Sequence, residues 1–163
     1  MGRANVEKSI IFMYGEYMNS NHLKFRCPDA LCSGMAILDG FRFMINSRGV
    51  ATIVPDGGSQ VQGVLWRVTP FDEGDIDKTL GYNAEEPEKS RCDKLVLMTH
   101  TGVGMPVEAI VYVEKDTTPG EPAQSYMQKV ISGAAEHAVE KKYIDEVLRR
   151  YKPKIKRETF TTY

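Results

Sequence analysis

The sequence has few of the residues that build disulfide or metal sites. It holds three cysteines and three histidines among 163 residues. The cysteines form no Cys-x-x-Cys pair, and their odd number disfavours a disulfide framework. His22, His100 and His137 lack the paired spacing that places two metal ligands on one face. We therefore expect reduced, partly buried cysteines and no metal centre.

An excess of one charge and a long apolar run are also missing. Lysine and arginine total 21, and aspartate and glutamate total 22, so no overall field favours a polyanion. The apolar run at residues 10–13 is far shorter than the roughly 20 residues of a membrane-spanning helix, and no signal-peptide pattern accompanies it. We expect neither nucleic acid nor membrane as a partner, and a cytoplasmic location is the default.

The chain length fits one hydrophobic core rather than two. We expect a single domain over residues 1–151, followed by a basic C-terminal tail over residues 152–163. Lysines and Arg157 alternate there with Pro153 and Ile155, a pattern more typical of a solvated terminus than of a docking segment. The sequence is compatible with a homodimer.

Apolar and β-branched runs predict strands through most of the first two thirds of the chain. A turn is expected at residues 55–58, where proline, aspartate and two glycines follow one another. Gly102 and Gly104 predict a hairpin between the last two strands. The expected strands cover residues 9–14, 35–45, 50–54, 61–68, 93–101 and 105–114.

Helices are expected mainly after the strands. Asn19 or Ser20 caps a short helical turn, while Thr69 and Pro70 begin a helix that Gly81 ends. Two further helices are predicted over residues 123–138 and 141–151. Strands first and helices last favour an α+β fold with a mixed, barrel-like sheet and short helices packed around it.

Several segments, taken in order, resemble the γ-glutamylcyclotransferase family, also called AIG2-like, from about Ile10 to Tyr151. Residues 12–18 (FMYGEYM) resemble the family's Tyr-Gly-Ser-Asn-Leu/Met loop. Residues 51–53 (ATI) and 62–66 (QGVLW) resemble its Ala-Thr-Ile segment and the following Gly-Val-x-Trp strand. Its late helical signature is matched by Ser125-Tyr126, Gly133-Ala134 and Tyr143-Ile144.

This resemblance implies a γ-glutamylcyclotransferase-like fold and a small-molecule substrate. In the family, loop amides hold a γ-glutamyl carboxylate, and a glutamate moves protons while the α-amine attacks the γ-carbonyl and releases 5-oxoproline. One partly desolvated carboxylate can carry out both proton transfers. The reaction needs neither a metal nor an organic cofactor.

The chain departs from the family pattern at its reactive positions. Residues 76–81 (IDKTLG) match the family's Leu-Asp-x-x-Glu-Gly stretch with Leu80 in the place of the glutamate. In the loop, Glu16 stands where the family has serine, and Tyr17 stands where it has asparagine. A carboxylate is thus expected to be lost from one pocket wall and gained on another.

Glu16 is therefore the candidate for a relocated acid/base, against the plainer interpretation of a surface glutamate that caps a helix or pairs with Arg26. The expected substrate-binding residues, each of which packing alone could also explain, are Tyr14, Gly15, Tyr17, Met18, Tyr82 and Tyr126.

Three functional hypotheses stay open at this point. The first is cofactor-independent proton transfer on a small metabolite, by cyclisation, isomerisation or lyase chemistry, with Glu16 as acid/base. The second is classical release of 5-oxoproline. The third is a catalytically inactive descendant that binds a ligand or a protein.

Overall fold

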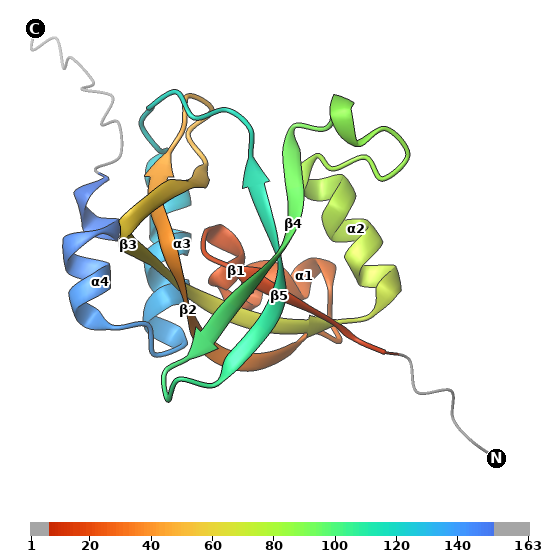
Figure 1. The fold of residues 1–163 in the computed structure, drawn as a ribbon, viewed down its shortest axis with the longest axis horizontal. Helices are drawn as coiled ribbons and strands as arrows, with labels where there is room; N and C mark the ends of the chain where they lie inside the picture. Colours follow the sequence, from red (N-terminus) through yellow and green to blue (C-terminus); the bar gives the residue numbers. More distant parts are fainter. Residues whose placement is uncertain (1–6, 152–163) are drawn as a thin grey trace, which may run out of the picture.

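The computed structural model describes residues 7–151, so the predicted tail at 152–163 lies outside it. Its centre is a closed barrel with the strand order β1-β3-β2-β4-β5 (Figure 1). The strands are β1 (Ser9–Met13), β2 (Leu31–Ile45), β3 (Ala51–Val68), β4 (Cys92–Thr101) and β5 (Pro106–Glu114).

One parallel pairing closes the barrel. β1 pairs with β5 in parallel at Ile11 and Ile110, whereas the other neighbouring strands are antiparallel. This arrangement brings the C-terminal ends of β1 and β5 and the N-terminal ends of β3 and β4 to the same end of the barrel. The expected α+β fold with a mixed, barrel-like sheet is confirmed.

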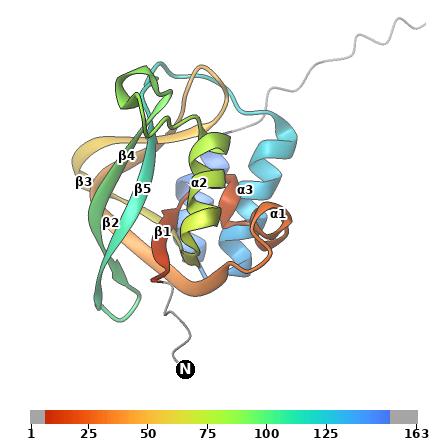
Figure 2. The same ribbon diagram turned by 90° about the vertical axis from the view of Figure 1, so that its right-hand side faces the viewer.

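The helices gather on one side of the barrel (Figure 2). The α-helices are α1 (Ser20–Arg26), α2 (Pro70–Leu80), α3 (Gln124–Glu136) and α4 (Lys141–Glu146). Short 3-10 turns form η1 (Glu16–Met18), η2 (Pro87–Lys89) and η3 (Leu148–Arg150). No helix within residues 7–151 is long and apolar enough to span a membrane.

The capping signals act as the sequence predicts. The Asn19 side chain accepts a hydrogen bond from the His22 amide at the start of α1, and Thr69 accepts one from the Asp72 amide at the start of α2. Gly81 ends α2 in the left-handed region, with φ 83°. Glycine adopts this conformation without the steric cost that a side chain would add.

The prediction that a turn at residues 55–58 separates two strands is wrong, because β3 continues through these residues. The register passes from Asp39 opposite Gln60 to Phe41 opposite Pro55, so β3 carries a bulge of extra residues. Inside the bulge, Asp56 accepts hydrogen bonds from the Gly58 amide and the Ser59 hydroxyl. The turn-forming residues therefore bend a strand rather than end it.

The helix expected over residues 141–151 is shorter than predicted. α4 ends at Glu146, and η3 follows after Val147. The Tyr151 hydroxyl donates to the Phe43 carbonyl at 3.0 Å, and the two aromatic rings meet edge to face. The tighter last turn accompanies this contact with β2.

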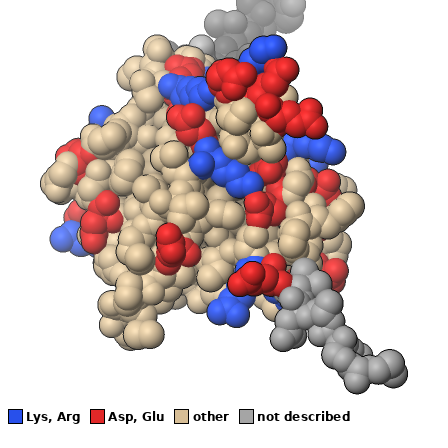
Figure 3. All heavy atoms as spheres, turned by 45° about the vertical axis from the view of Figure 1, so that its right-hand side comes forward, with Lys and Arg blue, Asp and Glu red and all other residues tan. Residues whose placement is uncertain are grey.

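The hydrophobic core fills the barrel and the space beneath the helices. Residues 61–66 of β3 are all buried, as expected for a strand covered on both faces. Trp66 and Phe12 are among the largest side chains without solvent exposure. On the outside, acidic and basic side chains are intermixed over the face shown in Figure 3, in line with the balanced composition.

Candidate functional site

A pocket of about 210 Å³ opens at the end of the barrel where β1 and β5 finish. Its walls come from η1, the β2–β3 turn, the last turn of α2, the starts of β3 and β4, and α3. The residues that line these walls include Leu80, Tyr14, Gly15, Glu16, Tyr17, Arg48, Arg91, Cys92, Tyr112, Glu114 and Tyr126.

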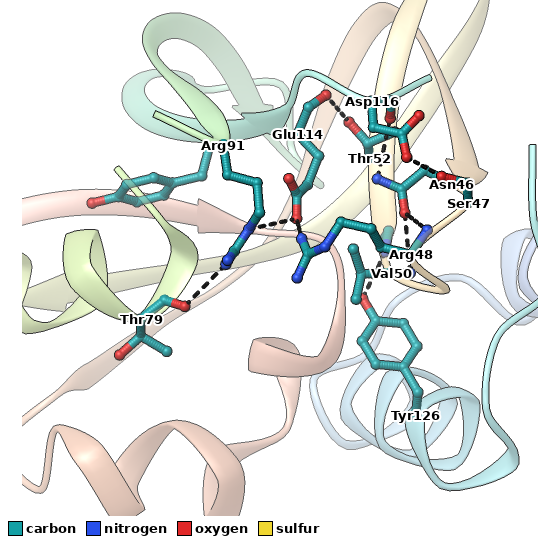
Figure 4. A network of polar contacts seen from close by, with 12 residues as sticks. Asn46, Ser47, Arg48, Val50, Thr52, Thr79, Arg91, Glu114, Asp116 and Tyr126 are labelled. Atoms are coloured by element: carbon teal, nitrogen blue, oxygen red, sulfur yellow. Dashed lines mark hydrogen bonds and ion pairs between the residues drawn. The ribbon is translucent and has the colours of Figure 1, made fainter. Parts of the chain in front are cut away.

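Glu114 is more buried than Glu16, the other carboxylate on the pocket wall, and ion pairs hold it in place. It is the last residue of β5, and its side chain is 12% exposed. Its Oε1 accepts a hydrogen bond from Arg48 Nη1 and lies 3.5 Å from Arg91 Nε (Figure 4). Its Oε2 is buried and has no hydrogen-bond partner among the described residues. A buried polar atom without a partner is costly, so a donor from a ligand would be stabilised there.

A tight turn between β2 and β3 directs Arg48 toward the pocket. The buried Asn46 side chain accepts from the Arg48 amide at 3.1 Å and donates to the Asp116 carbonyl at 3.1 Å. Gly49 completes the turn with φ 77°. The Thr52 hydroxyl donates to the Glu114 carbonyl at 2.9 Å, which joins the start of β3 to the end of β5.

Arg91 reaches Glu114 by crossing the end of α2. A Cβ on Gly81 would lie 2.8 Å from Arg91 Cζ, so the glycine leaves room for the guanidinium as well as ending the helix. Arg91 Nη2 donates to the Thr79 carbonyl at 3.5 Å. Cys92 follows Arg91 in the chain. Burial is the main cause that raises the pKa of its thiol to about 11, and the negative charge of Glu114 is the second, so this thiol stays protonated at neutral pH.

Two tyrosines form much of the remaining polar wall. The Tyr14 hydroxyl donates to the Tyr112 carbonyl at 2.6 Å, and the Tyr126 hydroxyl accepts from the Ala51 amide at 2.8 Å. Burial is the main cause that raises the pKa of both phenols, which therefore stay neutral. A Cβ on Gly15 would lie 3.1 Å from the Tyr126 hydroxyl, so the glycine allows this close approach.

Glu16 lies at the start of η1, on the pocket wall, and does not pair with Arg26. Its Oε2 is 3.2 Å from His22 Nε2, although that nitrogen does not reach hydrogen-bond geometry. Burial lowers the pKa of His22 more than the nearby carboxylate raises it, so the imidazole is mostly neutral at pH 7. The His22 ring also stacks on Tyr17 at 4.6 Å between centroids.

Comparison with known proteins identifies the family. Residues 11–130 match the family model described as "Gamma-glutamyl cyclotransferase, AIG2-like". The chain belongs to this family. The resemblance noted in the sequence is thereby confirmed for family membership, whereas the alignment of Leu80 with the family's glutamate stays a prediction.

Several solved structures share the fold of this chain. A γ-glutamyl cyclotransferase superposes with a TM-score of 0.80 at 20% identity, covering 96% of this chain and 93% of that one. An uncharacterized human protein gives 0.79 at 23% identity, with 90% and 89% covered. An AIG2-like protein from mouse gives 0.55 at 20% identity, with 69% and 81% covered. No curated protein sequence matches the chain significantly.

The fold brings most of the predicted site residues of this family member together. Tyr14, Gly15, Glu16, Tyr17 and Tyr126 all lie on the pocket wall. The other two do not. Met18 is fully buried in the core, and Tyr82 lies under Lys94, whose Nζ is 5.4 Å from the ring centroid.

Three charged residues of the pocket were missed by sequence reasoning. Arg48 and Arg91 stand in polar connecting segments, and Glu114 ends a predicted strand. The only available signal was a carboxylate at the end of a mostly apolar strand. Each lies far in sequence from its partners, 66 residues in the case of Arg48 and Glu114.

Proposed function

We propose that the chain is a cofactor-independent enzyme that cyclises a small γ-glutamyl-type metabolite, with Glu114 as its acid/base. One observation carries this proposal. Glu114 places a buried carboxylate oxygen without a partner on the wall of the pocket, while two arginines hold its other oxygen. Such a fixed, partly desolvated carboxylate is suited to proton transfer.

The charges of the pocket support a zwitterionic substrate. Glu16 and Glu114 contribute two negative charges, and Arg48 and Arg91 contribute two positive charges. The arginine side chains are 41% and 44% exposed, so they keep N–H groups available beyond Glu114. A substrate carboxylate would bind these donors, and a substrate amine would lie toward Glu114.

The reaction then needs only one carboxylate to move protons. Glu114 takes a proton from the substrate α-ammonium, and the free amine attacks the γ-carbonyl carbon. The new ring C–N bond forms as the bond to the departing amine breaks. Glu114 passes the two protons that the attacking nitrogen loses, one after the other, to that amine, which leaves as an ammonium ion. The Tyr126 hydroxyl accepts a hydrogen bond from the Ala51 amide, and its O–H can donate a hydrogen bond to the substrate carbonyl.

Glu16 is the competing acid/base, as the sequence predicts. It shares the pocket wall, but its carboxylate lies beside His22 and is 26% exposed. We propose that Glu16, with Tyr14, Gly15 and Tyr17, shapes the binding end of the pocket.

A second candidate is a ligand-binding protein without turnover. The observation that favours it is Leu80, which lies on the pocket wall and which the resemblance aligns with the family's glutamate. Leucine cannot transfer protons. Under this hypothesis the arginines and Glu114 hold a ligand that leaves unchanged.

Mass spectrometry of purified protein with γ-glutamyl dipeptides, glutathione and a metabolite extract tests these alternatives. We expect wild-type conversion, a loss of about 10²-fold or more in Glu114→Gln, and little change in Glu16→Gln. The opposite pattern in two folded variants would assign the role to Glu16. No conversion, combined with a ligand-dependent rise in Tm, would support the binding protein.

A gain-of-function variant checks the alignment of Leu80. If this residue occupies the place of the family's glutamate, Leu80→Glu should release more 5-oxoproline than wild type from γ-glutamyl compounds. The matched control Leu80→Gln, of the same shape without the carboxylate, should not.

A further inference from the structure

A second cluster of reactive side chains lies outside the pocket walls. It joins Cys32 at the start of β2, Ser20 at the start of α1, and Glu136 and His137 at the end of α3. Cys32 is exposed, and its Sγ lies 3.3 Å from His137 Nδ1. The two residues are 105 positions apart in the sequence, and the fold alone brings them together.

The sulfur also accepts a hydrogen bond from the backbone. The Gly34 amide donates to Cys32 Sγ at 3.3 Å. This contact depends on a register shift between Cys32 and Gly34 in β2, where Gly34 adopts φ 97°. Two nitrogen groups are therefore directed at one sulfur.

His137 is oriented as a base toward this sulfur. Its Nε2 lies 2.8 Å from Glu136 Oε1 and 2.8 Å from Ser20 Oγ. A proton held on Nε2 by these oxygens leaves the Nδ1 lone pair facing the thiol. The imidazole is 13% exposed, and the Trp66 ring packs edge to face against it.

The end of a helix and a carboxylate surround the imidazole. His137 follows the last residue of α3, where the helix dipole stabilises cations. Hydrogen bonds from Ser20 and the charge of His137 lower the pKa of Glu136, so its carboxylate stays ionised. A Cys–His–carboxylate arrangement of this kind activates a thiol as a nucleophile.

We infer that Cys32 is an activated thiol that takes up small-molecule disulfides as a covalent modification site. The thiol gives its proton to His137 Nδ1, and the thiolate attacks one sulfur of a disulfide R–S–S–R. The Cys32–S–S–R bond forms while the original S–S bond breaks, and the leaving R–S⁻ takes the proton from His137. The disulfide is the oxidant, and one R–SH is released.

The other two thiols of the chain provide an internal contrast. Cys27 and Cys92 are buried, and burial is the main cause that raises the pKa of each to about 11. Neither has a histidine at hydrogen-bond distance among the described residues. Modification should therefore select Cys32.

The test is the rate of adduct formation with the neutral disulfide bis(2-hydroxyethyl) disulfide at pH 6.5, followed by intact mass and peptide mapping. At that pH an ordinary thiol is about 1% thiolate. In general, a thiol that hands its proton to a neighbouring base gains about 100-fold in rate from the thiolate and loses about tenfold through the lower nucleophilicity of that thiolate. We therefore expect Cys32 to react about tenfold faster in wild type than in His137→Gln.

Two results would overturn the inference. One is an equal Cys32 rate in folded wild type and His137→Gln, which would mean that exposure alone governs the reaction. The other is first modification at Cys27 or Cys92. If His137→Gln does not fold, Glu136→Gln replaces it, and an unchanged Cys32 rate in that variant also refutes the activation.

Discussion

Gly133 in α3 packs directly against the backbone that follows η1, so Gly133→Ala tests how the fold positions the pocket wall. A Cβ at this position would lie 2.4 Å from the Asn19 amide nitrogen and 2.6 Å from the Met18 carbonyl carbon. Both atoms belong to the main chain, so no side-chain rotation relieves the clash. Either α3 or the segment that carries Glu16 must move.

The expected cost combines two opposing effects. Alanine in a helix interior is favoured over glycine by about 1 kcal/mol. Overpacking a tight contact costs about 1–3 kcal/mol, and the short backbone distances at Gly133 place this substitution near the upper value. We therefore expect a net loss of about 2 kcal/mol in the free energy of unfolding, which corresponds to a fall in Tm of about 4–8 °C for a chain of this size.

Gly74 in α2 provides the matched control. It is also a glycine inside a helix, but no atom lies within 4 Å of a Cβ built on it. Gly74→Ala should therefore gain up to about 1 kcal/mol. Urea and thermal unfolding of both variants decide the question. If Gly133→Ala is as stable as Gly74→Ala, the packing argument is wrong.

Two further substitutions test the backbone and the electrostatics. Ala138→Gly should stabilise the protein by about 0.5–1 kcal/mol in urea unfolding, because Ala138 has φ 59° and pays for a left-handed conformation; a loss of stability would refute this. Burial alone would raise the pKa of Glu73, but hydrogen bonds from Lys94 and Ser9 lower it. The stability from this depressed pKa is present above the unfolded value near 4.3 and is lost as the pH falls through the folded pKa. Lys94→Met should therefore lose about 2 kcal/mol at pH 7 and decline less between pH 5 and pH 3; an unchanged acid profile would contradict the assignment.

Local signals gave much of the fold. Thr69, Pro70 and Gly81 marked both ends of α2 because capping depends on neighbouring residues alone. The hairpin between β4 and β5 followed from glycines between two apolar runs. Residues 55–58 misled because turn-forming residues also build bulges, and only the partner strand decides between the two outcomes.

The candidate site was predictable only where it lies on one continuous segment. Tyr14, Gly15, Glu16 and Tyr17 form a single loop, and all four line the pocket. Met18 belongs to the same loop but points into the core, since η1 turns its side chain away from the pocket. Residue type alone does not reveal which side chains of such a short 3-10 turn face the pocket and which face the core.

The sequence by itself determined the class of the fold, the resemblance to the family and the loop that carries Glu16. These depend on composition, local periodicity and ordered motifs. Only the tertiary structure decided that Arg48, Arg91 and Glu114 meet in one pocket, and that Cys32 lies beside His137. Charged and nucleophilic side chains acquire such roles from neighbours distant in the chain, and barrel closure with helix packing sets those neighbours.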